Sequence, residues 1–406
     1  MLRPYRDVLT RPGAVSFSTA ALLARMPMAM AGIGTVLMVQ AVYGSYALAG
    51  QVAAVYLVVS AVAAPALAAL VDRHGQARVM RPALVVSGVG MAGLVAVGVA
   101  QPAVGWAFLA AGVAGLGKGS FGALVRARWS VTLDGEPGPL HVAYSWESVL
   151  DEVVFVVGPV LATLAATAVH PSAGLVVAAV AMLGGGWWFL AQRRTEPLPS
   201  GRRARSRTVL RSPGLVVLLV VFSAMGVIFG AADVATVAFA TEKGQRPLTG
   251  LVLAAFGVGS LVAGLLYGVR RWVSPPARRF AVSGVALAVG ASSFVLVGSL
   301  GQLAIVMVVA GGAIAPTMIT GTTLVTRIVP PDRLTEGLTW VGTSLVVGVS
   351  GGAALAGSAI DQAGSHGGFL VVVAAGAVVG VLVLATMPTL TRASGLAERI
   401  APRVGG

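Results

Sequence analysis

The stretch Ala68-Ala-Leu-Val-Asp72-Arg73-His74-Gly75-Gln76-Ala77-Arg78 forms a short polar segment between two long apolar runs, 47–71 and 82–100. Glycine readily ends a helix, and Gly75 stands where the apolar pattern stops. About 20 apolar residues cross a bilayer as a helix, so each flanking run is long enough to do so. The stretch therefore predicts two membrane-spanning helices joined by a tight polar turn.

Similar apolar runs, separated by breaks rich in Arg, Pro or Gly, occur along the whole chain of 406 residues. They predict twelve spans, at 14–42, 47–71, 82–100, 103–125, 143–168, 173–191, 213–240, 248–269, 280–300, 303–326, 337–360 and 367–388. Only 10% of the residues are charged, whereas a soluble domain carries about 25%. We therefore expect an all-α integral membrane protein.

The basic residues indicate how these spans are oriented. Nearly all of the 28 lysines and arginines fall at the N-terminus, after even-numbered spans or in the C-terminal tail. Outside the spans, only Lys243 and Arg246 lie in a loop on the other side. Because cytoplasmic loops carry an excess of Lys and Arg, both termini are expected in the cytoplasm, with the protein in the cytoplasmic (plasma) membrane. The net charge of +14 then reflects topology and not a nucleic-acid partner.

The longest break divides the spans six and six. It is rich in Arg, Ser and Pro, and it predicts an N-terminal six-helix bundle at 1–192, a cytoplasmic linker at 193–212, a C-terminal bundle at 213–391 and a tail at 392–406. Residues in the first half recur at matching spacing in the second: Trp146, Gly158, Leu161, Ala162 and Gly174 correspond to Trp340, Gly352, Leu355, Ala356 and Gly368. Such a repeat places a binding site between the halves near the bilayer midplane.

The stretch 68–78 resembles the small-x-x-x-Asp-Arg-x-Gly-x-x-Arg motif between spans 2 and 3 of the major facilitator superfamily, with Ala68 where the family usually has Gly. Weaker similarities are Gly158-Pro159 in span 5, 351–361 in span 11, and 264–271 after span 8, where Gly268 replaces an acid. The resemblance implies a secondary transporter of two pseudo-symmetric six-helix bundles that rock about a central site. It also implies a gating latch, which stabilises the outward-open state and consists of Asp72, Arg73, Gly75 and Arg78.

Five charged residues lie inside the expected spans. They are Arg25 in span 1, Lys118 in span 4, Asp151 and Glu152 in span 5, and Asp233 in span 7. A charge at the centre of a membrane helix costs about 2.5–3.5 kcal/mol, so these residues are the candidates for substrate binding and proton coupling. Softer polar candidates are Gln40, Ser120, Thr317, Thr320 and Trp340.

Spans 4 and 5 run antiparallel, which brings Lys118 to about the depth of Asp151 and Glu152, so that they could pair. Glu147 and Asp151 share one helix face, where two carboxylates repel each other. Either Arg126, Arg128 or Lys118 compensates them, or one carboxylate holds a proton. A desolvated carboxylate of this kind could carry a proton, and the structural alternative is a fixed ion pair that locks spans 4 and 5.

Several other chemistries are excluded. The chain has no cysteine, so it has no disulfide, thiolate metal site or cysteine nucleophile. The glycine patterns at 88–93 and 112–119 resemble nucleotide-binding motifs, but they lie within apolar spans and not between a strand and a helix. The histidines His74, His141, His170 and His366 show no metal-ligand spacing. We expect no cofactor, no metal and no ATP-driven step.

These observations favour proton-coupled efflux, by antiport, of a small organic molecule. The expected partners are that substrate, protons and the lipid bilayer, and the expected oligomeric state is a monomer. Proton-coupled uptake of a nutrient or metabolite is the alternative within the class. A non-transporting scaffold or receptor is the alternative from another class. An enzyme is not expected, because an intramembrane hydrolase needs a nucleophile and a base at matched depth, and no histidine lies inside a span.

Overall fold

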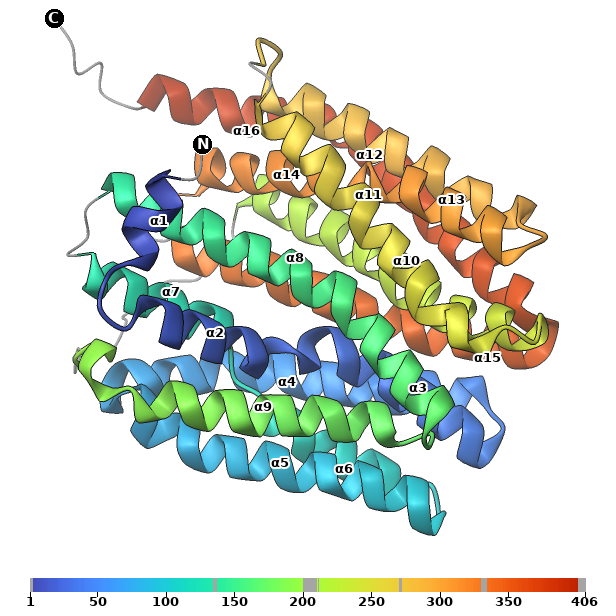
Figure 1. The fold of residues 1–406 in the computed structure, drawn as a ribbon. Helices are drawn as coiled ribbons and strands as arrows, with labels where there is room; N and C mark the ends of the chain where they lie inside the picture. Colours follow the sequence, from blue (N-terminus) through green and yellow to red (C-terminus); the bar gives the residue numbers. More distant parts are fainter. Residues whose placement is uncertain are drawn as a thin grey trace, which may run out of the picture. The chain divides into compact units, whose positions relative to one another are not determined.

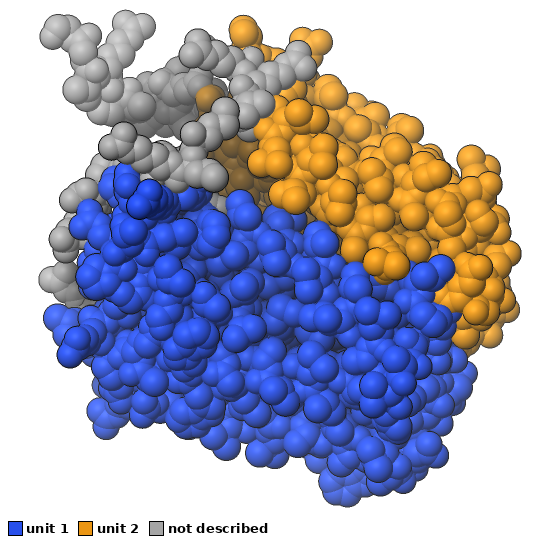
Figure 2. Space-filling model, in the orientation of Figure 1, with its two compact units in different colours: residues 1–205, 246–250 blue, residues 206–245, 251–406 orange. Residues whose placement is uncertain are grey.

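The computed structural model describes residues 3–133, 137–199, 210, 212–269, 272–329 and 334–400. Within these ranges every regular element is a helix and there is no strand. The chain forms two compact units, residues 1–205 with 246–250 and residues 206–245 with 251–406 (Figure 2). The boundary between residues 205 and 206 falls in the Arg-rich segment 193–212, of which residues 200–209 and 211 lie outside the described part.

The first unit is a helical bundle in which α9 packs against four other helices and α6 packs against α4 and α5 (Figure 1). Helix α9 packs against α2, α3, α5 and α8, while α3 also packs against α4 and α8. Its helices are α1 (Arg3–Leu9), α2 (Ala14–Arg25), α3 (Pro27–Tyr43), α4 (Tyr46–His74), α5 (Gln76–Ala100), α6 (Gly105–Leu116), α7 (Phe121–Thr132), α8 (Pro137–Ala168) and α9 (Ala173–Ala191), followed by the short turn η1 (Arg193–Thr195).

The second unit is built around α10 and α15, which share its largest helix–helix contact. Helix α12 packs against α13, α14 and α15. The elements are α10 (Pro213–Glu242), α11 (Thr249–Val269), α12 (Pro276–Ser292), the turn η4 (Ser293–Leu296), α13 (Leu300–Gly311), α14 (Ile314–Ile328), α15 (Leu334–Ala385) and α16 (Met387–Ile400). The turn η3 (Arg246–Leu248) and the first two residues of α11 belong to the first unit.

Eleven helical segments of the described chain are long and apolar enough to cross a membrane, and the last of them contains two crossings. Segment Trp340–Ala385 has 46 residues, more than twice the 20 or so that one crossing needs. Gly364 interrupts it with φ 70° and ψ −171°. A Cβ atom on Gly368 would lie 2.9 Å from the side chain of Ile360, although a straight helix would separate these residues by about 12 Å. The chain therefore reverses at Gly364, which gives the twelve spans expected from the sequence.

A carboxylate holds this reversal in place. Glu242, the last residue of α10, accepts hydrogen bonds from the backbone nitrogen of Ser365 at 2.7 Å and from its hydroxyl group. The backbone N–H groups at the start of a helix have no partners within the helix, and they carry the positive end of its dipole. Glu242 thus caps the second half of α15.

In two of the membrane-length segments the helix is interrupted partway along its length. Span Ala14–Tyr43 consists of α2 and α3, which meet at Met26 and Pro27, because proline has no N–H to continue the first helix. Span Gly105–Thr132 consists of α6 and α7, which are separated by the non-helical residues 117–120. Both breaks lie in the first unit, next to the charged residues described below.

Glycines bring α10 and α15 into close contact. Gly226 and Gly230 are four residues apart on α10, and Gly348 and Gly352 are four apart on α15. A Cβ atom at each of the four would overlap a backbone carbonyl oxygen of the opposite helix. This is the spacing by which small residues let membrane helices approach closely.

Candidate functional site

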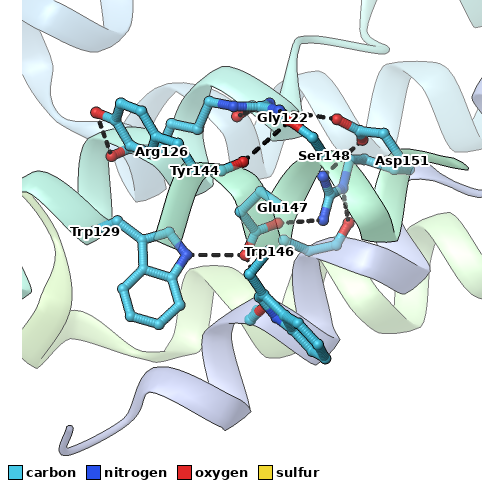
Figure 3. Close-up of polar contacts among 11 residues, drawn as sticks. Gly122, Arg126, Trp129, Tyr144, Trp146, Glu147, Ser148 and Asp151 are labelled. Carbon is cyan, nitrogen blue, oxygen red and sulfur yellow. Dashed lines mark hydrogen bonds and ion pairs between the residues drawn. The ribbon is translucent and has the colours of Figure 1, made fainter. Parts of the chain in front are cut away.

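Four charged side chains of the first unit form an ion-pair network, which comprises Arg25, Arg126, Glu147 and Asp151. Arg25 bridges both acids, with Nη2 at 2.5 Å from Glu147 Oε2 and Nη1 at 2.7 Å from Asp151 Oδ1. Arg126 Nη2 lies 3.0 Å from the other oxygen, Asp151 Oδ2 (Figure 3). The two positive and two negative groups compensate one another.

Three helices position this network. Glu147 and Asp151 lie one turn apart on α8 and so present both carboxylates on one face. Arg25 is the last residue of α2, where its Nε donates to the carbonyl oxygen of Ala21 at 3.0 Å. Arg126 lies on α7, where its Nη1 donates to the carbonyl oxygen of Gly122 at 3.0 Å. Each guanidinium is therefore fixed to its own helix before it reaches α8.

Glu147 is the enclosed member of the network. Its side chain is 0% exposed. Oε1 accepts hydrogen bonds from the Ser18 hydroxyl at 2.6 Å and from Trp129 Nε1 at 2.9 Å (Figure 3). Trp146 Nε1 in turn donates to the Ser18 hydroxyl at 3.1 Å. All of these contacts hold one carboxylate in place, so Glu147 serves to position Arg25.

Asp151 is the accessible member. Its side chain is 25% exposed and that of Arg126 is 31% exposed, whereas the side chain of Arg25 is only 3% exposed. The network thus runs from a dry end at Glu147 to an accessible end at Asp151 and Arg126. A proton or a ligand can reach Asp151 without opening the core around Glu147.

Of the three cations that could compensate the acids of span 5, Arg126 pairs with Asp151, whereas Lys118 pairs with neither acid. No ion pair in the described part of the chain involves Lys118, and Arg25 and Arg126 neutralise Asp151 instead. The depth of a residue along a helix follows from its position in the sequence, but the face on which it lies relative to other helices does not. Arg25 was recognised as an intramembrane charge, and only the packing of α2 on α8 makes it the counter-ion.

Among the residues that the structure describes, the other predicted site residues form no ion pair with the members of this network. Glu152 follows Asp151 on α8, is half-buried, and has no ion pair or hydrogen bond to another described residue. Lys118 lies in the break between α6 and α7. Asp233 belongs to the second unit, where its side chain is exposed although its neighbours on α10 are buried. The hydroxyls of Thr317 and Thr320 bond to carbonyl oxygens of their own helix, α14.

The turn between α4 and α5 contains the gating residues expected from the sequence. Helix α4 ends at His74, and Gly75 has φ 91°, a conformation that glycine adopts without strain. Its N–H donates to the carbonyl oxygen of Val71 at 2.7 Å. Asp72, Arg73 and Arg78 have exposed side chains around this turn.

A residue that the sequence analysis did not single out binds this turn. Glu196, just after η1, accepts a hydrogen bond from the backbone nitrogen of Ala77 at 2.8 Å and so caps the first turn of α5. Next to it, Arg128 is fully buried, with its guanidinium 3.7 Å from the centre of the Phe189 ring. Arg128 donates to Gln76 Oε1 at 2.9 Å and to the carbonyl oxygen of Gln192 at 2.9 Å. Glu196 and Arg128 therefore fasten the segment after α9 to the turn at Gly75.

We expect Glu196→Ala to destabilise the protein by about 0.5–2 kcal/mol, the usual cost of losing a helix N-cap. The substitution leaves the N–H of Ala77 without its acceptor and removes a negative charge from the positive end of α5. Thermal unfolding of the purified protein in detergent measures the effect. Leu198→Ala, at a side chain that is 92% exposed in the same segment, is the control. Equal stability of the two variants would contradict the capping role.

The histidines do not gather into a metal site. No group of three or more His, Asp or Glu side chains in the described ranges could hold a metal ion. His170 Nδ1 accepts a hydrogen bond from the nitrogen of Ser172 at 3.2 Å, and His366 packs against Phe239 and Phe369. These contacts belong to helix ends and to aromatic packing.

Eleven helical segments of the described chain, one of them double, are long and apolar enough to cross a membrane, which is the pattern of a polytopic membrane protein. The sequence profile of the Major Facilitator Superfamily matches residues 17–274, more than half of the chain, and the chain belongs to this superfamily. It is accordingly a membrane transporter. The comparison with curated proteins gives no match.

Solved structures share the fold across nearly the whole chain. The nucleoside transporter NupG superposes with a TM-score of 0.71 at 13% identity, over 93% of this chain and 98% of its own. An auto-inhibited POT family peptide transporter gives 0.65 at 14% identity, over 100% and 98%. A bacterial homologue of the iron transporter ferroportin, in its inward-facing state, gives 0.62 at 18% identity, over 92% and 99%. At such identities the likeness is one of fold alone.

Proposed function

We propose that this protein exports a small organic molecule across the cytoplasmic membrane by alternating access, in exchange for protons. Membership of the superfamily supports transport. The Gly158-Pro159 pair in α8 favours export, since it resembles part of the motif of antiporters in this superfamily. Proton-coupled uptake of a nutrient remains the alternative, and the two differ in the direction of net flux under an imposed pH gradient.

The observation that carries proton coupling is the placement of Asp151. Its carboxylate lies within a membrane-length helix, is shared by two arginines, and is partly accessible. Protonation of Asp151 would remove its attraction for Arg126 and free that guanidinium to move. Because Glu147 holds Arg25 independently, the dry end of the network would stay assembled while the accessible end opens.

We assign the other predicted residues to the gating latch, to substrate binding and to a second proton-accepting position. Asp72, Arg73, Gly75 and Arg78 act as the latch that stabilises the outward-open state, and the Glu196 cap on α5 keeps the turn rigid. Asp233, exposed on α10 of the second unit, is a further candidate for substrate binding. Glu152 acts as a second proton acceptor beside Asp151.

We expect Asp151→Asn to abolish accumulation driven by a pH gradient. One pH unit corresponds to about 1.4 kcal/mol, or about tenfold accumulation for one proton per substrate. The asparagine keeps the size of the side chain but cannot exchange a proton. A substrate panel is first screened by counterflow in proteoliposomes, and uptake of the molecules found is then measured with and without an imposed pH gradient.

Counterflow needs no net proton movement, so the variant should still exchange substrate across the membrane. Asp7→Asn, at an exposed aspartate of the short helix α1, is the matched control and should behave as the wild type. Full gradient-driven accumulation by Asp151→Asn would overturn the assignment of Asp151, and Glu152→Gln would then be the next variant to measure. No counterflow with any molecule of the panel would favour the scaffold or receptor alternative.

A further inference from the structure

The break in the fourth span lies halfway along the membrane-length segment Gly105–Thr132. Helix α6 ends at Leu116, helix α7 begins at Phe121, and Gly119 between them has φ 60°. A Cβ atom on Gly117 would overlap the carbonyl oxygen of Ala83 on α5, and one on Gly119 would overlap the side chain of Met80. Because glycine has no Cβ atom, residues 117–119 can pack directly against α5. The break is therefore held in place by helix packing.

The break leaves polar backbone groups unpaired within the span. The N–H groups of Ala123 and Leu124 donate to the carbonyl oxygen of Ser120, both at 3.1 Å, but those of Phe121 and Gly122 have no acceptor among the described residues, and the side chain of Ser120 does not cap them. Ser120 is exposed, and Lys118 and Gly119 are half-buried. Non-helical backbone at this depth is tolerated where it is enclosed by protein or faces a water-filled cavity. The N-terminus of α7 is thus a partial positive charge at an accessible position.

Lys118 adds a full positive charge at the same place. Its ammonium lies 5.3 Å from the centre of the Tyr56 ring and forms no ion pair with any residue that the structure describes. Tyr56 is 1% exposed, and its hydroxyl has no hydrogen-bond partner among the described residues. An aromatic ring attracts a cation, but it does not neutralise its charge. A lysine at this depth is costly, so an ammonium that no described carboxylate neutralises is a position where an anion from outside the chain would be favoured.

The ion-pair network does not supply that compensation. The carboxylates of Glu147 and Asp151 are already bound by Arg25 and Arg126. The network instead borders the same turn of α7, because a Cβ atom on Gly122 would lie 3.2 Å from Arg126 Nη1 and 3.8 Å from Arg25 Cδ. Among the cations around the break, Arg25 and Arg126 are thus compensated within the described part of the chain, and the charge that favours an anion there is that of Lys118.

We propose that Lys118 and the first turn of α7 bind a carboxylate group of the transported molecule, which makes the substrate an organic anion. The ammonium of Lys118 supplies the charge, and the N–H groups of Phe121 and Gly122 supply directed hydrogen bonds, as helix N-termini do for anions elsewhere. This inference rests on the proposed function, because it assigns the ligand to the transport site. It names the class of substrate that the comparisons leave open.

The test measures binding, without any gradient, to the full-length protein in detergent. The probes are three carboxylates and their uncharged amides: benzoate with benzamide, lactate with lactamide, and succinate with succinamide. At least one carboxylate should raise the unfolding temperature more than its amide does. Lys118→Gln should weaken that binding about tenfold or more, as the loss of a charge-assisted hydrogen bond does, and Lys118→Arg should retain it. Lys243→Gln is the matched control, because Lys243 also lies over an aromatic ring, at 5.2 Å from Phe239.

A chemical rescue separates loss of charge from loss of fold. The chain contains no cysteine, so Lys118→Cys introduces the only thiol. Treatment with 2-aminoethyl methanethiosulfonate places an ammonium at this position and should restore the carboxylate preference, whereas the 2-hydroxyethyl reagent should not. The inference is overturned if no carboxylate is preferred over its amide, if Lys118→Gln keeps the preference, or if both reagents act alike. Because no proton gradient is involved, failure of proton coupling at Asp151 would leave this result unaffected, and the reverse also holds.

Discussion

Replacement of Arg25 by glutamine is expected to destabilise the protein by about 3–5 kcal/mol, the cost of breaking a buried ion pair by removing one partner. Glu147 is fully enclosed and would be left with a negative charge and two neutral hydrogen-bond donors, Ser18 and Trp129. Asp151 would lose one of its two arginines but would keep Arg126. Thermal or denaturant unfolding in detergent, together with the yield of monodisperse protein, measures the loss.

A double-mutant cycle tests the physical reason. The variant Arg25→Gln with Glu147→Gln should be more stable than Arg25→Gln alone, because the uncompensated buried charge is gone. Arg194→Gln, at an exposed arginine of η1, is the control for the same change of side chain. A loss of stability no larger at Arg25 than at Arg194 would show that the network does not hold the first unit together.

Alanine at Gly348 is expected to destabilise the second unit by about 1–3 kcal/mol, and leucine by more, because both overpack a close helix crossing. The added Cβ would overlap the backbone carbonyl oxygen of Ser223, which belongs to α10 and cannot rotate away as a side chain can. The same crossing contains Gly226, Gly230 and Gly352, so a shift at one position would disturb the other three. Unfolding temperature in detergent is the measurement.

Gly351→Ala is a sharp control because it lies on the same helix and has nothing within 4 Å of the added Cβ. Alanine favours a helix over glycine by about 1 kcal/mol, so this variant should be as stable as the wild type or more stable. If Gly348→Ala and Gly351→Ala had the same stability, the close approach of α10 and α15 would not matter for the fold.

Hydropathy predicted the spans closely because it is a local property. The expected runs 47–71, 173–191 and 213–240 correspond to the helices Tyr46–His74, Ala173–Ala191 and Pro213–Glu242. The repeated glycines also occupy similar packing positions. A Cβ atom on Gly158 would overlap Ala29 on α3, and one on its counterpart Gly352 would overlap Val227 on α10. The mid-span break after Leu116 was not anticipated, since residues 112–119 fit an apolar helix by composition.

The candidate site was predicted in part. All four charges of the ion-pair network, Arg25, Arg126, Glu147 and Asp151, were visible as charges at or inside the spans. Arg126 was one of three possible partners of the acids, but the role of Arg25 was not predicted, because pairing depends on how each helix is rotated about its axis. Glu196 was overlooked for a related reason: an acid in an Arg-rich segment looks like an ordinary surface residue until the fold brings it to the first turn of α5.

The sequence by itself determined that this chain is a helical membrane protein of two halves, because the free energy of placing a segment in lipid is summed over neighbouring residues. It also showed which charges require an explanation. The tertiary structure alone decided that Arg25 neutralises the acids of α8, and that Lys118, in a broken helix, forms no ion pair with any described residue. Those outcomes depend on the packing of helices remote in sequence, and no local property of the chain contains that information.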